Sequence, residues 1–163
     1  MVINMLKKIL YGGIIMSTFI FCGCFNKKIE IKNTKSFYYY YSVSNAKDGS
    51  YLFKLNLEED KFVAYYKGEG ISEEDSIKKE INNDKVLELE QILTKYKIYK
   101  WNGFKKSNKR ILDGNSFSLN YKTENNSIEA SGYMSYPNGY KEFKEEIKKW
   151  YTELFKEEIE KIH

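Results

Sequence analysis

Apolar and polar positions alternate over much of residues 36–67, which is typical of β-strands whose two faces meet different surroundings. Residues 51–57 show this best, because four large apolar side chains fall on one face: Tyr51, Phe53, Leu55 and Leu57. Turn-forming residues precede that segment, and three acidic residues follow it. The pattern therefore predicts three consecutive strands joined by short turns, at residues 36–44, 51–57 and 61–67.

The second half of the chain changes to helical spacing and back. After a polar stretch that predicts a loop at 68–83, apolar residues three and four positions apart predict a helix over 84–96, with Asp84 at its N-cap. Alternation returns around an Asn-rich turn and predicts a second hairpin, at residues 116–122 and 127–133. A last apolar stripe predicts a helix over 140–162.

The predicted elements occur in the order βββ-α-ββ-α, and 163 residues give room for one domain. We therefore predict a single α+β domain over residues 36–163. Its expected architecture is an antiparallel sheet of about five strands with two helices packed on one face.

The N-terminal residues have the composition of an export signal. Lys7 and Lys8 precede a 13-residue apolar run, shorter than the ~20 residues that a membrane span needs. Met5 is an alternative start, since the lysine pair follows it as well. The run ends in Phe21-Cys22-Gly23-Cys24, which resembles the lipobox of bacterial lipoproteins. The prediction is a signal peptide over 1–23, removed on export, and lipidation of Cys24.

Acylation of Cys24, with palmitate as an expected chain, would anchor the protein to the extracytoplasmic face of the cell membrane. The Lys-rich segment 24–35 would then be a tether between the membrane and the domain. An uncleaved N-terminal anchor helix is the alternative, and it would leave Cys22 and Cys24 as free thiols.

The amino-acid composition argues against several kinds of catalytic and binding site. The single histidine is the terminal His163, which argues against a His-based catalytic triad or metal site. The net charge of +4 is too small to indicate a nucleic-acid partner. With Cys22 removed and Cys24 acylated, no thiol remains, and the sequence has no phosphate loop or dinucleotide fingerprint. We expect no catalytic residue, no metal and no cofactor.

Two groups of residues are candidates for ligand binding. Among 15 tyrosines, four are consecutive; on a strand Tyr38 and Tyr40 face one side, and Tyr39 and Tyr41 the other. One pair can pack in the core, while the other covers the opposite face or meets a ligand. The second group lies in a predicted basic loop, whose four cations could hold a polyanion: Lys105, Lys106, Lys109 and Arg110. The competing interpretations are a cross-strand tyrosine ladder and a solvated loop.

Short motifs between Trp101 and Phe143 carry a family resemblance. They are Trp101-Asn102-Gly103-Phe104, Leu112-Asp113-Gly114, Ser116-Phe117-Ser118-Leu119, Ala130-Ser131-Gly132-Tyr133 and Tyr136-Pro137. With the upstream lipobox, they resemble a group of bacterial lipoproteins that has no assigned activity. The resemblance implies an exported domain and a shared fold, but no reaction and no functional residues.

The leading functional prediction is a membrane-anchored surface lipoprotein, not an enzyme, whose domain binds a ligand of the cell envelope. That ligand could be a glycan, a polyanion or a protein. An accessory or structural subunit of an envelope protein complex is the alternative. A carboxylate-dependent hydrolase, using the acidic clusters at 58–60 and 73–75, is a third and weaker hypothesis, because such clusters usually form solvated turns.

Overall fold

The computed structural model describes residues 29–44, 49–68, 71, 75–111 and 113–161. Within these ranges seven strands form one mixed sheet in the order β4-β3-β2-β1-β6-β7-β5. The strands are β1 Thr34–Ser42, β2 Ser50–Glu58, β3 Lys61–Lys67, β4 Ile77–Ile81, β5 Phe104–Ser107, β6 Ser116–Thr123 and β7 Ser127–Tyr133. The helices are α1 Asn83–Lys95, the 3-10 helix η1 Ile98–Trp101, α2 Tyr140–Leu154 and α3 Lys156–Glu160.

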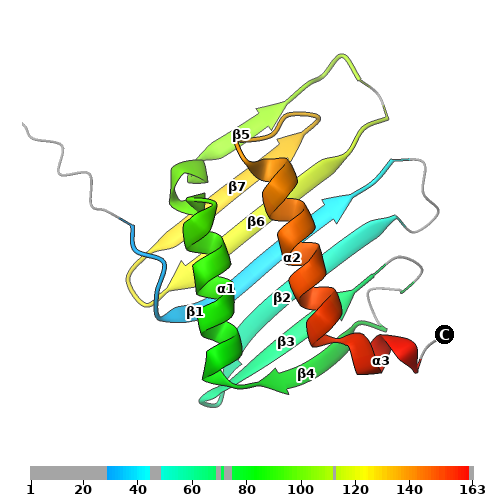
Figure 1. The fold of residues 1–163 in the computed structure, drawn as a ribbon. Coiled ribbons are helices and arrows are strands. Elements are labelled where there is room, and N and C mark those ends of the chain that lie inside the picture. The colour runs from blue at the N-terminus through cyan, green and yellow to red at the C-terminus, as the bar shows by residue number, and fades with distance from the viewer. Residues whose placement is uncertain (1–28, 45–48, 69–70, 72–74, 112, 162–163) are drawn as a thin grey trace, which may run out of the picture.

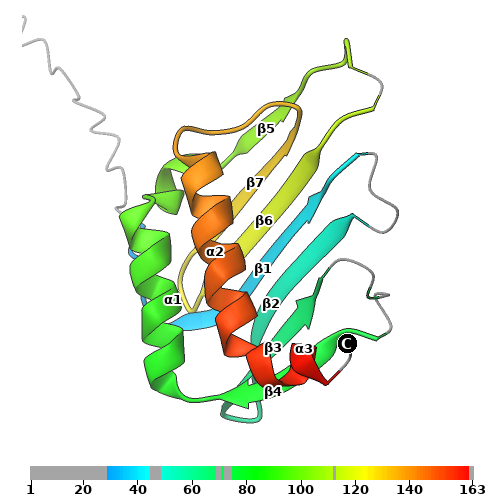
Figure 2. The same ribbon diagram turned by 45° about the vertical axis from the view of Figure 1, so that its right-hand side comes forward.

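The described helices lie on one face of the sheet (Figure 1). In a view turned by 45°, α1 and α2 again lie side by side over the strands, and the opposite face carries no described helix (Figure 2). This layering confirms the predicted α+β class. It also divides the sheet into a helix-covered face and an open face, and these two names are used below.

The predicted count of about five strands is wrong, because two short strands form where the sequence predicts loops. Strand β4 lies inside the predicted loop 68–83, and β5 lies within the basic segment after Trp101. Both are Lys-rich edge strands whose own sequences have little strand propensity, so pairing with a neighbouring strand decides their conformation. Strand β5 pairs in parallel with β7, so the sheet is mixed and the predicted all-antiparallel arrangement is wrong as well.

Element boundaries also differ from the prediction. The N-cap of α1 is Asn82 rather than Asp84, since the Asn82 side chain accepts a hydrogen bond from the Lys85 N–H at 3.1 Å. The last helix breaks at Phe155, whose backbone leaves helical geometry, and continues as the short α3. Strand β1 begins at Thr34, inside the segment 24–35 that the sequence predicts as a tether.

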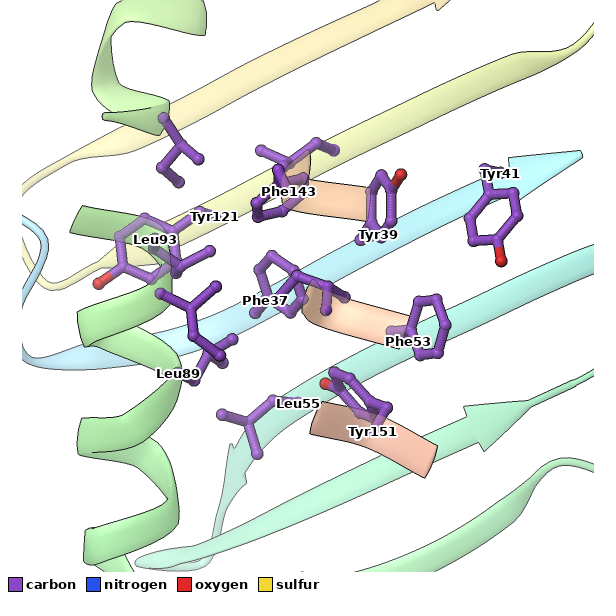
Figure 3. Close-up of a cluster of buried hydrophobic side chains, with 14 of the residues drawn as sticks. Phe37, Tyr39, Tyr41, Phe53, Leu55, Leu89, Leu93, Tyr121, Phe143 and Tyr151 are labelled. Carbon is purple, nitrogen blue, oxygen red and sulfur yellow. The ribbon is translucent and has the colours of Figure 1, made fainter. Parts of the chain in front are cut away.

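The core is built mainly from aromatic rings between the sheet and α2 (Figure 3). Tyr39 of β1 stacks on Phe53 of β2, with ring centroids 6.0 Å apart, and meets the edge of Phe143 at 5.3 Å. Phe53 in turn contacts the ring of Tyr151 at 4.8 Å. Fully burying a side chain of this size contributes about 1.5–3 kcal/mol, so these contacts are the main attachment of α2 to the sheet.

A buried polar contact joins the start of β1 to helix α1. Thr34, at the start of β1, donates to the Glu90 carboxylate of α1 from its backbone N–H at 3.0 Å and from its hydroxyl at 2.7 Å. The Thr34 hydroxyl also lies 3.1 Å from the phenolic oxygen of Tyr121. Burial raises the pKa of Tyr121 to about 12. The contact fixes the point at which the preceding segment reaches the domain.

Candidate functional site

The structure separates the four consecutive tyrosines into two pairs. Tyr39 and Tyr41 are 0% and 4% exposed under the helices, and burial raises the pKa of both hydroxyls. Tyr38 is 36% exposed and Tyr40 is half-buried, both on the open face. The predicted alternation is confirmed. A ligand on the open face would meet Tyr38 and Tyr40, whereas Tyr39 and Tyr41 belong to the core and are withdrawn as candidates.

Strand register aligns the open-face side chains into rows across the sheet. Tyr38 lies opposite Lys54 on one side and Asn120 on the other. Lys54 is opposite Tyr65, and Tyr65 is opposite Lys78. The resulting line, which we call the central row, runs from β4 to β7 through Lys78, Tyr65, Lys54, Tyr38, Asn120 and Glu129.

Neighbouring side chains hold the Tyr65 end of the central row in place. The Lys54 ammonium lies 4.8 Å from the centroid of the Tyr65 ring, a cation–π contact. The Tyr65 hydroxyl donates to the Glu58 carboxylate at 2.8 Å, and Asn56 donates to the same oxygen at 3.2 Å. These hydrogen bonds, that of Tyr65 first, lower the pKa of Glu58, so this carboxylate stays charged and keeps the phenol oriented.

The central row presents two aromatic rings with polar groups between and beside them. Tyr38 and Tyr65 are on β1 and β3, so one intervening strand separates them by about 10 Å. Lys54 lies between the rings, and Asn120 supplies both a donor and an acceptor next to Tyr38. An extended molecule could therefore contact both rings and hydrogen-bond to the side chains along the same line.

The row on the Tyr40 side of the central row is less accessible. Leu52 and Lys67 follow the alternation onto the open face, but they are only 8% and 9% exposed. The Lys67 ammonium donates to the Ser50 hydroxyl at 2.6 Å. Tyr40 lies opposite Leu52 and is half-buried beside it. The open face is therefore more accessible along the central row than along the row that contains Tyr40.

The four cations predicted as one basic patch do not form one. Lys105 points to the open face, opposite Ser131, with its ammonium 3.8 Å from Glu129. Lys106 is on the other face of β5, and its ammonium lies 5.3 Å from the Phe104 ring centroid. Lys109 and Arg110 are exposed in the turn after β5. Adjacent strand residues point to opposite faces, so the strand that replaced the predicted loop also separated its charges.

Sequence analysis missed Tyr65, Lys54 and Asn120 as partners of Tyr38. The alternation of residues 61–67 puts Tyr65 on the face opposite Tyr66, and this signal was available. The alignment of Tyr65 with Tyr38 depends on the β2–β3 and β1–β2 registers, and no local pattern contains it.

The acidic clusters do not converge on a site in the described residues. Glu59 and Asp60 form the exposed β2–β3 turn, both with positive φ. Glu73 and Glu74 lie outside the described residues. Searching the described ranges reveals no group of three His, Cys, Asp or Glu side chains placed to hold a metal ion.

The predicted signal peptide, Cys22 and the lipidation site Cys24 all lie outside the described residues. No described helix is both long enough and apolar enough to cross a membrane. The sequence matches no protein-family model and no curated protein. The resemblance of residues 101–143 to bacterial lipoproteins therefore stays a prediction, and the functional argument rests on the geometry of the open face.

Proposed function

We propose that the chain is a lipid-anchored binding protein of the bacterial cell envelope, and that its open face binds a glycan. The central row carries this proposal, because its register sets Tyr38 and Tyr65 on either side of Lys54. The anchoring part rests on the lipobox that ends at Cys24.

The chemistry of the central row suits a sugar chain. The face of a sugar ring carries C–H groups, which pack well on the electron-rich face of a tyrosine ring. Sugar hydroxyls are both donors and acceptors, and they find complementary groups in Lys54, Asn120 and Glu129. Two rings about 10 Å apart are too distant to touch one sugar unit, so the expected ligand is an oligosaccharide or a longer glycan.

The place where the tether joins the domain is compatible with this role. Thr34 is fixed to α1 by Glu90 at one end of β1, and the nine residues of β1 extend about 30 Å from that point. A domain held by an acylated Cys24 through a short tether would stay close to the membrane surface, where envelope glycans are found.

The anchoring part is tested by the intact mass of the protein purified from a membrane fraction. A chain that starts at Cys24 and carries diacylglycerol is expected, and Cys24→Ala should abolish the modification. A mass that begins at Met1 or Met5 would contradict lipidation and favour an uncleaved anchor.

The binding part is tested with the membrane-extracted protein and glycan strands released from peptidoglycan, using isothermal titration calorimetry. Tyr38→Ala and Tyr65→Ala should each weaken binding about tenfold, which corresponds to ~1.4 kcal/mol. Tyr136→Ala is the matched control, because Tyr136 is 37% exposed, like Tyr38, but lies on the helix-covered side.

An equal loss of affinity in Tyr136→Ala, or no binding by the unaltered protein, would contradict a glycan site on the open face. Recovery of one stable protein partner by cross-linking in intact cells, without glycan binding, would instead support the accessory-subunit hypothesis.

A further inference from the structure

A second surface, on the helix-covered side, gathers three lysines around a pocket of about 470 Å³. The end of α1, the η1 turn, strand β5 and the β7–α2 connection form its walls, beside the first turn of α2 (Figure 1). We call it the basic pocket and define it by six of its lining residues: Tyr96, Lys97, Lys100, Phe104, Lys106 and Tyr136.

The positive charge of the basic pocket is not neutralised within the described part of the chain. No carboxylate lines the pocket, and Lys97, Lys100 and Lys106 form no ion pair with any described residue. Two lysines of α1 differ, since Lys85 pairs with Glu88 and Lys95 pairs with Glu146. An anion entering the basic pocket would therefore meet three uncompensated charges.

The backbone brings two of these charges together. Lys97 has a left-handed conformation, with φ of 53° and ψ of 43°, and its carbonyl accepts a hydrogen bond from the Lys100 N–H at 2.8 Å. Both side chains line the basic pocket, so the two ammonium groups face the same space. Like charges placed side by side repel, and a bound anion would relieve the repulsion.

Lysine is an unfavourable residue for the backbone at position 97. A left-handed conformation just after a helix is usually taken by glycine, because a Cβ atom is strained there. This chain uses glycine at its other helix-flanking positive-φ sites, Gly103 and Gly139, both with φ of 78°. Lys97 shares positive φ with other non-glycine residues of the described ranges, such as Glu59 and Met134, but unlike them it lines the basic pocket.

Aromatic rings form the rest of the pocket surface. Tyr136 is 37% exposed and stacks on Tyr140, with centroids 4.6 Å apart and planes 18° apart. The Lys106 ammonium lies 5.3 Å from the centroid of the Phe104 ring. The pocket thus combines cations with a fixed, partly exposed ring on which the carbon skeleton of a ligand could pack.

We propose that the basic pocket binds a phosphate ester of a sugar or polyol. Lys97, Lys100 and Lys106 hold the phosphate, and Tyr136 packs against the carbon skeleton. Three ammonium groups match the oxygens and the charge of a phosphate better than the two oxygens and single charge of a carboxylate, and lysine is a common point-charge ligand for phosphate. The site is separate from the central row and does not depend on the glycan proposal.

Calorimetry with glucose 6-phosphate and the full chain in non-ionic detergent tests the site directly. We expect saturable binding that weakens as salt is added, and no binding of glucose. Lys100→Gln and Lys106→Gln should each lower the affinity about tenfold. Lys109→Gln is the matched control, because it removes the same charge from the turn after β5, outside the pocket lining. An equal loss in Lys109→Gln would overturn the proposal, because it would indicate non-specific electrostatic attraction.

The variant Lys97→Gly separates a functional role from a structural one. It should raise the melting temperature, since glycine relieves the left-handed strain, and it should lower the affinity for glucose 6-phosphate. A raised melting temperature with unchanged affinity would overturn the role of Lys97. Tyr38→Ala should leave phosphate binding unchanged, so failure of the glycan proposal and failure of this one are distinguishable.

Competition experiments identify the source of the phosphate. Displacement of glucose 6-phosphate by soluble poly(glycerol phosphate) would point to an anionic wall polymer, and displacement by a short-chain phosphatidylglycerol would point to a lipid headgroup. Either result supports a phosphate-ester site. Absence of saturable binding for all three compounds would overturn it.

Discussion

The phenolic oxygens of Tyr39 and Tyr140 lie 3.0 Å apart in the core, with Tyr39 donating and Tyr140 accepting. This hydrogen bond joins the central strand β1 to the first residue of α2, 101 positions later. Tyr140 also stacks under the exposed ring of Tyr136. The same pair of tyrosines thus connects the sheet core to the wall of the basic pocket.

Removing the two hydroxyls of this pair one at a time should cost more in total than removing both together. Tyr140→Phe leaves the buried Tyr39 hydroxyl without its acceptor, at an expected cost of about 1–3 kcal/mol in unfolding free energy. The double variant Tyr39→Phe/Tyr140→Phe should cost less than the sum of the single variants. Urea unfolding of all four proteins measures the coupling, and strictly additive effects would contradict it.

Removing the Tyr151 hydroxyl, by contrast, should stabilise the domain. It is fully buried and has no hydrogen-bond partner among the described residues. Tyr151→Phe removes an unsatisfied polar atom, so it should raise the unfolding free energy by about 1 kcal/mol. Tyr121→Phe, which loses the hydroxyl facing Thr34, is the matched control and should lower it by a similar amount. A destabilised Tyr151→Phe would show that its hydroxyl has a partner in solution.

Gly132 of β7 should tolerate no side chain. A Cβ atom there would lie 2.0 Å from the Ser135 carbonyl oxygen and 2.6 Å from Phe117, so the backbone would have to move. Gly132→Ala is expected to cost about 2 kcal/mol or more. Gly103→Ala provides the comparison, because a Cβ there meets no described atom within 4 Å and only its φ of 78° opposes it. In thermal unfolding, the melting temperature of Gly132→Ala should be well below that of Gly103→Ala. Equal melting temperatures would contradict the predicted clash.

Alkaline pH should unfold the domain, because ionisation of its buried tyrosines is possible only when they leave the core. Burial is the main cause that raises the pKa of Tyr39, Tyr41, Tyr140 and Tyr151. In the unfolded chain they ionise near pH ~10, whereas in the folded protein they stay protonated at that pH. Their contribution to stability is therefore complete below pH ~10 and is lost as the pH rises toward their folded pKa values.

Tyrosinate absorbance and far-ultraviolet circular dichroism, followed over the same titration, check this. The exposed tyrosines should ionise first, and a second rise in absorbance should coincide with loss of the dichroism signal. Ionisation of the whole tyrosine set with the dichroism intact would contradict the expected linkage.

The central elements could be predicted from the sequence because their signals are local. The period-two alternation set Tyr39 and Tyr41 apart from Tyr38 and Tyr40, and the spacing of Phe143 and Ile147 located the buried stripe of α2. Strands β4 and β5 could not be predicted in this way. Their short Lys-rich sequences take strand geometry only because β3 and β7 offer paired edges, and those edges exist only in the folded sheet.

The candidate site residues likewise fall into those that the sequence could predict and those that it could not. The sequence was enough to predict that the four tyrosines occupy two faces and that the domain is α+β, and the structure confirms both predictions. The export signal with a lipobox stays a prediction from the first residues. The folded structure was needed to show which tyrosine pair is buried, that Tyr65 aligns with Tyr38, and that Lys106 lines one pocket with Lys97 and Lys100. The physical reason is that side-chain direction follows from neighbouring residues, whereas strand register and the meeting of a helix end with a distant edge strand depend on contacts between remote parts of the chain.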